Sequence, residues 1–388
     1  MKLSNEGVYE KPGYDITGVY EIWVGTGIGA GHKSSTVTRV KPTAIVIGGG
    51  DVNYSDQPCY DYYALAHLGE QRQFGFLQNL TDRRNKVPYN MTTAAKLRAL
   101  LANESEVVVC PGVYDGFTAR LALNAGFKTL YMTGAGTTMS CLGIADLGVA
   151  TMNDMRDNAF MIANIDPTIP LIADADTGYG GPLMVSRTVA SYISAGVAAM
   201  HIEDQVVNKR CGHLRNKELV PLPEFVSRIR AAALKRDELG RDIVIIARTD
   251  ALADQGYDEA VLRLHAAVDA GADVVFLEGV RDTEDAKRVC EEFGKKGVSC
   301  LYNCVPGGVS PVLSVKEARE CGYRLVITPT LALGAVFESV GKAYKELLEN
   351  GNTKGNGVAV RDLFDSCGLK EATEFDVKAG GKLYQNGI

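Results

Sequence analysis

Eight short apolar runs, each followed by a helical pattern or a long connection, constrain the fold of this 388-residue chain more than any other feature. The runs are EVVVC (106–110), TLYMT (129–133), PLIAD (170–174), AAMHI (198–202), IVIIA (243–247), DVVFL (273–277), CLYN (300–303) and RLVIT (324–328). Apolar strands that alternate with helices predict a parallel sheet covered by helices on both faces. Eight such units within about 240 residues predict a closed (β/α)₈ barrel of the TIM type. A doubly wound open sheet is the alternative.

Helical patterns lie between the apolar runs. They include FTARLALNAG (117–126), LMVSRTVASYISAG (183–196), LPEFVSRIRAAALKR (222–236), YDEAVLRLHAAVDAG (257–271) and DAKRVCEEFG (285–294). Several end in Ala-Gly or Phe-Gly, which favours helix termination. We therefore assign residues 93–388 to one α/β domain, the catalytic barrel with C-terminal helices. Residues 1–92 are rich in Tyr and Gly, lack helical periodicity, and form an irregular N-terminal extension of unassigned role.

Two Gly-rich segments of that extension look like nucleotide-binding loops but lack the helix that such loops need. VYEIWVGTGIGAGHKSS (19–35) places Gly25, Gly27 and Ala30 at dinucleotide spacing, and IVIGGGD ends at Asp51. A dinucleotide fingerprint needs a strand before it and a helix after it. Here β-branched residues and a proline follow, and no Lys-Ser/Thr pair opens a helix. We expect no nucleotide site in residues 1–92.

Composition excludes several classes of protein. The net charge of −6 leaves no basic excess to neutralise nucleic-acid phosphates. No window of about 18 apolar residues predicts a membrane span, and the polar start MKLSNEGVYEKPGYD has no secretory apolar region. The nine cysteines are odd in number and include no C-x-x-C pair, which indicates a reducing compartment. We expect a cytoplasmic protein, with the mitochondrial matrix as the other option.

Polar residues that follow the apolar runs predict an active site. In (β/α)₈ barrels the carboxyl ends of the strands build this site. Asp174 ends the third run and Asp176 follows it, Glu203 follows the fourth, and Asp146 lies in the connection after the second. Four carboxylates at one mouth repel each other unless a cation is present. Oxygen ligands without clustered His or Cys favour Mg²⁺, or alternatively Mn²⁺.

The segment from Glu203 to about Pro221 is long for a strand-to-helix loop, which is typical of an active-site lid. It carries the sequence Lys209-Arg210-Cys211-Gly212-His213. Flanking cations would lower the pKa of the Cys211 thiol and prepare it for proton transfer. The alternative is a surface loop with an incidental cysteine.

Taken together, the motifs PGVYDG, DADTGYGGP, IEDQ followed by NKRCGHL, and IARTDA resemble the isocitrate lyase / phosphoenolpyruvate mutase superfamily. The resemblance covers residues 93 to the C-terminus. It is nearest to the fungal-type 2,3-dimethylmalate lyases and oxaloacetate hydrolases, and it does not extend to the N-terminal residues.

The resemblance implies roles for individual residues. Asp174 matches the direct Mg²⁺ ligand, and Asp146, Asp176 and Glu203 match residues that hold the metal through water. The implied catalytic residues are Cys211, Arg248, His213 and Glu278, with Cys211 as the acid. The implied substrate-binding residues are Thr133, Gly134, Ala135, Asp115, Tyr179, Arg248, Asn303 and Pro329.

The activity that the resemblance implies is a Mg²⁺-dependent carbon–carbon lyase. Such an enzyme cleaves a small 2-hydroxy di- or tricarboxylate to an α-oxo acid and a carboxylate through an enolate. Alternatives are oxaloacetate hydrolysis to oxalate and acetate, carbon–phosphorus chemistry, and an idle barrel in an assembly or regulatory role. Family analogy also implies a homotetramer with an exchanged C-terminal helix, for which residues 359–369 are the candidate.

Two positions depart from the family pattern. Close relatives have Asn-Met-Val-Glu after the seventh strand, whereas this chain has Asn303-Cys304-Val305-Pro306 and lacks the pocket Glu. The serine that oxaloacetate hydrolases carry after the eighth strand is Pro329 here, as in dimethylmalate-type lyases. The second difference weakens the oxaloacetate alternative, and the first leaves the substrate open.

Overall fold

The computed structural model describes residues 91–352, 355 and 357–386. The extension predicted over residues 1–92, with both Gly-rich segments and the expectation that no nucleotide binds there, therefore lies almost wholly outside the described residues. Its boundary with the catalytic domain stays a prediction.

Eight strands alternate with helices along the described chain. The strands are β1 (Val108–Val113), β2 (Leu130–Met132), β3 (Leu171–Asp174), β4 (Ala199–Glu203), β5 (Val244–Thr249), β6 (Val274–Leu277), β7 (Ser299–Asn303) and β8 (Leu325–Thr328). The helices are α2 (Thr93–Ala102), α3 (Gly116–Asn124), α4 (Gly134–Leu142), α5 (Met152–Ala163), α6 (Pro182–Ala195), α7 (Leu222–Leu239), α8 (Tyr257–Asp269), α9 (Thr283–Gly294), α10 (Val315–Cys321), α11 (Leu331–Asn350), α12 (Val360–Ser366) and α13 (Leu369–Lys378).

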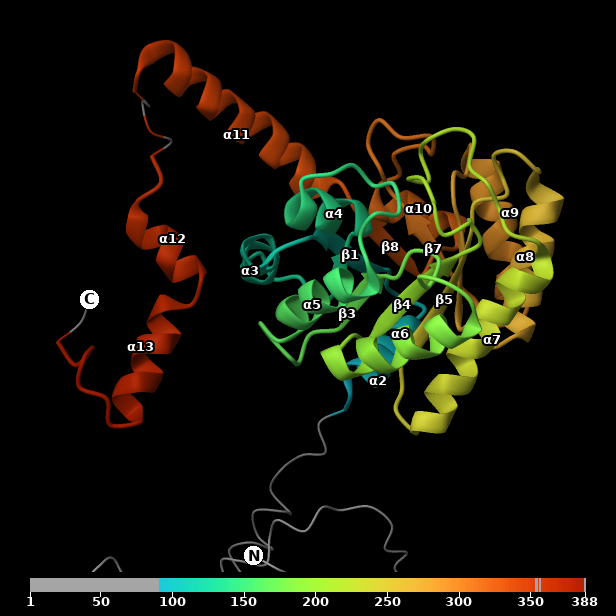
Figure 1. Cartoon of the computed structure of the whole chain (residues 1–388), viewed down its shortest axis with the longest axis horizontal. Helices are drawn as coiled ribbons and strands as arrows, with labels where there is room; N and C mark the ends of the chain where they lie inside the picture. Colours follow the sequence, from blue (N-terminus) through green and yellow to red (C-terminus); the bar gives the residue numbers. More distant parts are fainter. Residues whose placement is uncertain (1–90, 353–354, 356, 387–388) are drawn as a thin grey trace, which may run out of the picture. The chain divides into compact units, whose positions relative to one another are not determined.

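The strands form a closed parallel barrel in sequence order, with helices packed around it (Figure 1). β1 pairs with β2 on one side and with β8 on the other, where Val108 lies opposite Leu325. The predicted (β/α)₈ barrel is confirmed, and the doubly wound open sheet is wrong. Because all strands are parallel, their carboxyl ends meet at one mouth.

The strand predicted at 106–110 is shifted, because β1 continues through Pro111 and Gly112. A Cβ atom at Gly112 would lie 2.5 Å from the backbone oxygens of Thr328 and Pro329. Only glycine allows β1 to approach the end of β8 so closely. The Pro-Gly pair therefore closes the seam of the barrel, although in sequence it is typical of a strand end.

The barrel interior is filled by apolar side chains from every strand, such as Ile172, Ile246 and Phe276, and it includes Leu97 from α2. Leu97 is fully buried. The neighbouring Arg98 forms ion pairs with Asp242 and Asp273, which precede β5 and β6. Helix α2 therefore closes the amino-terminal end of the barrel, opposite the mouth that carries the polar residues.

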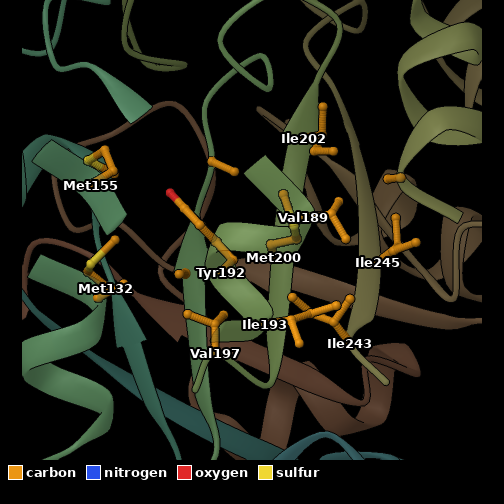
Figure 2. Close-up of a cluster of buried hydrophobic side chains, with 14 of the residues drawn as sticks. Met132, Met155, Val189, Tyr192, Ile193, Val197, Met200, Ile202, Ile243 and Ile245 are labelled. Atoms are coloured by element: carbon orange, nitrogen blue, oxygen red, sulfur yellow. The ribbon is translucent and has the colours of Figure 1, made fainter. Parts of the chain in front are cut away.

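A second apolar layer lies between the strands and the surrounding helices. Figure 2 shows part of it, where Val189, Tyr192 and Ile193 of α6 lie beside Met200 and Ile202 of β4. Burial of each such side chain stabilises the fold by roughly 1.5–3 kcal/mol. The scaffold under the mouth is therefore close-packed and holds the strand ends in fixed positions.

The C-terminal helices α11, α12 and α13 carry no buried residues in the structure. Several large apolar side chains are exposed there, including Phe337 and Leu348 at 86% each and Phe375 at 72%. Helix α12 contacts the barrel through its Ser366 carbonyl, which accepts a hydrogen bond from Asn124 of α3. Among the residues that the structure describes, no helix is both long and apolar enough to cross a membrane.

Candidate active site

Two carboxylates, each from a different strand-end connection, converge on the ammonium group of a third connection. Lys209 Nζ lies 2.6 Å from Asp146 Oδ1 and 2.6 Å from Asp176 Oδ1. Asp176 follows β3, Asp146 lies between α4 and α5, and Lys209 comes from the connection after β4. All three side chains are buried. The structure therefore brings two of the predicted metal-site residues together, with a lysine between them.

Asp174 and Glu203, the last residues of β3 and β4, complete the acidic group. Burial raises the pKa of Asp174 and Glu203, in the case of Glu203 well above its ordinary value, although Lys209 and Arg248 oppose that effect. Burial also raises the pKa of Asp176 to about 6, again against Lys209. Burial lowers the pKa of Lys209, but the surrounding carboxylates outweigh it and hold the ammonium charged. The mouth thus concentrates carboxylates in surroundings that disfavour their ionisation unless a cation is near.

The chemistry of these donors fits a hard divalent cation. Both side-chain oxygens of Glu203 are buried and accept no hydrogen bond, although Oε2 forms an ion pair with Arg248. All four predicted ligands offer oxygen, as Mg²⁺ and Mn²⁺ prefer. In the described part of the chain, no three His, Cys, Asp or Glu side chains stand close enough to hold a metal directly. The Lys209 ammonium, paired with Asp146 and Asp176, supplies the positive charge in this arrangement.

Helix α4 begins at the mouth, immediately after β2. Thr133 caps it by accepting a hydrogen bond from the amide of Gly136. A Cβ atom at Gly134 would lie 2.4 Å from Asp174 Oδ2, so the backbone there lies directly against that carboxylate. Free amides at a helix N-terminus bind anions. The predicted substrate-binding amides of Gly134 and Ala135 therefore belong to the first turn of a helix. The sequence did not predict this helix, because it begins with a Gly-rich segment.

Arg248 lies at the end of β5 and is surrounded by carboxylates. Its Nε is 2.9 Å from Asp250 Oδ2 and 3.2 Å from Glu203 Oε2, and its Nη2 is 3.5 Å from Glu278 Oε2. The guanidinium also lies 5.1 Å from the centre of the Phe276 ring. Arg248 is thus a fixed, buried cation beside the acidic group that surrounds Lys209.

The connection between β4 and α7, residues 204–221, crosses the mouth, and we call it the lid. At one side the Cys211 amide donates to the Asp146 carbonyl at 3.2 Å. At the other side the His213 ring accepts a hydrogen bond from the Val309 amide at 3.2 Å. Its base is ordered by Gln205, whose side chain bonds to both backbone groups of Arg210. The lid is therefore closed over the acidic group.

Nearby cations do act to lower the pKa of the Cys211 thiol, but the expected net lowering is wrong. Burial raises this pKa and Asp146 raises it further, and these effects exceed the opposing influence of the His213 amide, Arg248 and Lys209. Cys211 therefore stays protonated at neutral pH, which is the form that a proton donor needs.

The far wall of the mouth contains three of the predicted residues. Asn303 Nδ2 donates to Glu278 Oε2 at 2.9 Å and lies 3.5 Å from the His213 ring. His213 Nε2 is 3.9 Å from Glu278 Oε1. Pro306, which stands where relatives have the pocket Glu, is exposed on the following loop.

The remaining predicted residues are placed less directly. Asp115 caps α3, where it accepts hydrogen bonds from the backbone amide and the hydroxyl of Thr118. Tyr179 directs its hydroxyl toward that of Tyr192 at 3.1 Å. Pro329 follows β8 and is half-buried. A substrate-binding role for these three stays a prediction.

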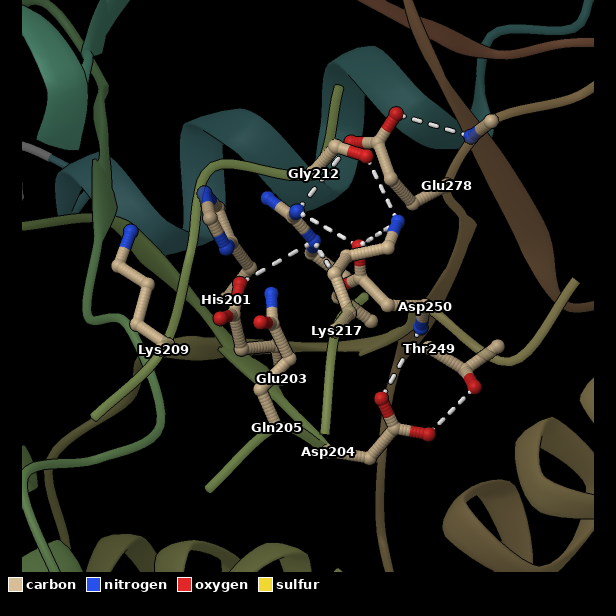
Figure 3. Close-up of polar contacts among 12 residues, drawn as sticks. His201, Glu203, Asp204, Gln205, Lys209, Gly212, Lys217, Thr249, Asp250 and Glu278 are labelled. Atoms are coloured by element: carbon tan, nitrogen blue, oxygen red, sulfur yellow. Dashed lines mark hydrogen bonds and ion pairs between the residues drawn. The ribbon is translucent and has the colours of Figure 1, made fainter. Parts of the chain in front are cut away.

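The prediction missed polar residues beneath the mouth, after β5, and in the second half of the lid, which leads to α7. His201 lies in the middle of β4, is fully buried and bonds to the Tyr131 hydroxyl at 2.9 Å. Lys217 and Asp250 form a buried ion pair at 2.8 Å (Figure 3). Two sequence features could have indicated these residues: the histidine inside the apolar run AAMHI, and the aspartate two residues after Arg248 in RTD.

Comparisons with known proteins agree with this geometry. The phosphoenolpyruvate phosphomutase family model matches residues 97–348. A 2,3-dimethylmalate lyase from Eubacterium barkeri is 39% identical over 291 residues, which are 74% of this chain and 98% of that protein.

Solved structures extend the comparison. A 2,3-dimethylmalate lyase structure is 51% identical with a TM-score of 0.74, covering 76% of this chain and 98% of that one. A structure of oxaloacetate acetylhydrolase with the inhibitor 3,3-difluorooxalacetate is 49% identical with a TM-score of 0.74, covering 76% and 99%. A phosphonopyruvate hydrolase complex with oxalate and Mg²⁺ is 26% identical with a TM-score of 0.65, covering 74% and 99%.

Proposed function

Because the chain belongs to the phosphoenolpyruvate mutase / isocitrate lyase superfamily, we propose that it is a Mg²⁺-dependent carbon–carbon lyase. Its substrate is a small 2-hydroxy di- or tricarboxylate. The hydroxyl gives up its proton to a base, the C–C bond beside the hydroxyl-bearing carbon breaks, and the oxygen becomes the carbonyl of an α-oxo acid. The electron pair passes to the second fragment as an enolate, which takes a proton and leaves as a carboxylate.

The observation that carries this proposal is the position of Cys211. The thiol stands on a closed lid whose backbone bonds to the Asp146 loop on one side and lies against Arg248 at Gly212 on the other. Burial keeps it protonated. A protonated thiol held over a closed mouth can donate to a carbanion from which water is excluded.

The other residues bind and orient the substrate. Arg248 offers a planar guanidinium for a carboxylate, and the first turn of α4 offers backbone amides at Gly134 and Ala135. Asp174 would hold Mg²⁺ directly, with Asp146, Asp176 and Glu203 holding it through water. When bound, the ion supplies Lewis acidity for the hydroxyl oxygen and its neighbouring carboxylate.

Oxaloacetate hydrolysis to oxalate and acetate is the second candidate, favoured by 49% identity to an oxaloacetate acetylhydrolase. Pro329, in place of the serine expected there for such hydrolases, argues against it. An idle barrel is the third reading, motivated by the missing pocket Glu at Pro306. We also propose that the chain forms homo-oligomers, since α11 exposes apolar side chains such as Phe337 and Leu348.

A substrate panel tests these readings. Purified protein with Mg²⁺ is offered 2-hydroxy diacids and oxaloacetate, and α-oxo acid and oxalate release are measured separately. A lyase releases α-oxo acid from a hydroxy diacid, whereas a hydrolase releases oxalate from oxaloacetate alone. Thermal stability with and without Mg²⁺ and oxalate is the parallel measurement, since a functional site is stabilised by its ligands. No turnover and no stabilisation would establish the idle barrel.

Cys211→Ser tests the proton donor. The change keeps the shape but raises the pKa of the acid far above the thiol's value of about 8.5. We expect kcat to fall roughly 10²–10⁴-fold, while Mg²⁺ and oxalate still stabilise the protein. Full activity of the variant on the substrate that the panel identifies would contradict the assignment.

A further inference from the structure

The second half of the lid, which leads to α7, carries a buried lysine. The Lys217 side chain is 2% exposed. Its Nζ donates to the Gly212 carbonyl at 2.6 Å and to Asp250 Oδ1 at 2.8 Å (Figure 3). A buried ammonium is costly unless it is paired and hydrogen-bonded. These two contacts join the peptide that follows Cys211 to the residue that follows β5.

Asp250 connects this lysine to the guanidinium at the mouth. Its carboxylate is fully buried and accepts hydrogen bonds from Arg248 Nε at 2.9 Å and Nη2 at 3.2 Å. Burial raises the pKa of Asp250, but Arg248 and Lys217 together hold it well below its ordinary value. Its backbone amide donates to Asp204 Oδ1, which fixes it to the end of β4. Asp250 is therefore an ionised, immobile anchor.

The lid backbone packs directly against the guanidinium at this point. A Cβ atom at Gly212 would lie 2.3 Å from Arg248 Nη2 and 2.8 Å from Glu278 Cγ. Only a residue without a side chain fits there, so the Gly212 peptide lies directly against the guanidinium that Asp250 binds, while Lys217 binds the carbonyl of the same peptide. Lid, lysine, aspartate and arginine form one continuous chain of charge-assisted contacts.

We propose that Lys217 is a positioning residue that locks the lid closed, and that it acts on the reaction through Cys211, one residue before the carbonyl it binds. Asp250 serves both ends of the chain, since it anchors Lys217 and orients Arg248. The effect on turnover rests on the proposed lyase function. The effect on lid closure rests only on the described contacts.

The test measures lid closure without substrate. Lys217→Met keeps the length of the side chain but removes both hydrogen bonds. Alkylation of Cys211 by iodoacetamide is followed by peptide mass spectrometry in the ligand-free protein, with the exposed Cys141 and Cys367 as internal references. We expect Cys211 to react roughly 10- to 100-fold faster in the variant, the factor that corresponds to losing charge-assisted hydrogen bonds. Lys235→Met, which removes a lysine paired with Glu238 on α7, is the matched control and should leave the rate unchanged.

Kinetics on the substrate from the panel separate positioning from a general loss of structure. In Lys217→Met, Asp250 keeps both bonds to Arg248, so kcat should fall roughly 10- to 100-fold while KM stays within about threefold. In Asp250→Asn, Arg248 loses the nearest of its three charged partners, so KM should rise as well. If the two residues had only a structural role, both variants should change KM in the same way, so a KM that rises in Asp250→Asn alone supports positioning.

Equal alkylation of Cys211 in Lys217→Met and in the wild type would overturn the proposal, and so would a lower melting temperature without faster alkylation. If Lys217→Met does not fold, the same measurement on Lys217→Gln, which keeps a neutral donor, decides with the same two outcomes. A protein that turns over no carboxylate refutes the proposed function, and the alkylation rates still judge the lid on their own.

Discussion

At the residue scale, His201 illustrates a polar group that supports the site from below. Its ring lies inside the barrel, between the Tyr131 hydroxyl and Asp174, with Nδ1 3.5 Å from Asp174 Oδ1. Burial, aided by the cationic Arg248, lowers its pKa from 6.5 to about 3. The imidazole is therefore neutral in the folded protein at every pH above about 4, where it can orient the proposed metal ligand without adding charge.

This burial makes stability fall at mildly acidic pH. The folded pKa lies below the unfolded one, so between about pH 3 and 6.5 the unfolded chain binds the extra proton. The stabilising contribution is complete above pH 6.5 and is lost as pH falls, by about 1.4 kcal/mol per unit. Denaturant unfolding at pH 7.5 and 5.5 should show a shallower loss in His201→Gln than in the wild type. The raised pKa values of the nearby carboxylates act in the opposite direction but are common to both proteins. Parallel pH profiles would contradict the assignment.

Asp174 gives the sharpest test of the metal at the same scale. Asp174→Ala removes the proposed direct ligand, so turnover should fall by more than about tenfold, a loss above ~1.4 kcal/mol. Mg²⁺ binding, measured by calorimetry, should weaken as well. Asp157→Ala, which removes an exposed carboxylate of α5, is the control and should change neither quantity. An Asp174→Ala protein with wild-type Mg²⁺ affinity would refute the ligand assignment.

The predictability of the site also depends on the individual residue. Residues that end or directly follow an apolar run, such as Asp174 and Arg248, could be placed at the mouth because strand ends fix their position. Lys217 and His201 could not be found in this way. Lys217 belongs to a loop whose path depends on contacts far along the chain, and His201 points into an interior that strand alternation alone does not distinguish from the helix-facing side.

At the element scale, apolar runs predicted all eight strands, usually to within one or two residues at each end. The exception is β1, because close contact with β8 overrides the local signal of Pro111-Gly112. The helical patterns named from the sequence did not include α2, α4, α5 or α10. In α4 the first turn contains glycines that serve the mouth rather than the helix. In β1 and α4 alike, a glycine is required because a distant backbone or carboxylate leaves no room for a side chain.

The β1–β8 seam is therefore a site where one methyl group should destabilise the fold. In Gly112→Ala the new Cβ meets two carbonyl oxygens at 2.5 Å, so the strands must separate. We expect a loss of about 1–3 kcal/mol in the free energy of unfolding, measured by denaturant titration. Gly294→Ala, at the end of α9 with open space around it, is the control and should be neutral or slightly stabilising. Equal stability of both variants would show that the seam tolerates a side chain.

At the scale of the whole molecule, both ends of the barrel are closed by segments of the same domain, α2 at the amino-terminal end and the lid at the mouth. Helix α2 plugs the amino-terminal end through Leu97 and Arg98, and its cap residue is Thr92. A chain that begins at Tyr89 keeps this helix intact. We expect that chain to fold, to melt within a few degrees of the full-length protein and to retain its activity. An insoluble or inactive product, or NAD or ATP binding by the full chain, would contradict the prediction that the first 92 residues carry neither the catalytic fold nor a nucleotide site.

The location of Lys209 on the lid, rather than on a barrel strand, makes the charge of the mouth depend on whether the lid is open. Lifting the lid withdraws an ammonium from within 2.6 Å of both Asp146 and Asp176, and the exposed acidic group then attracts cations and repels dicarboxylates. Closing it returns the charge and makes room for an anion. The lid therefore does more than cover the mouth, because the ammonium that offsets the charge of Asp146 and Asp176 arrives and departs with it.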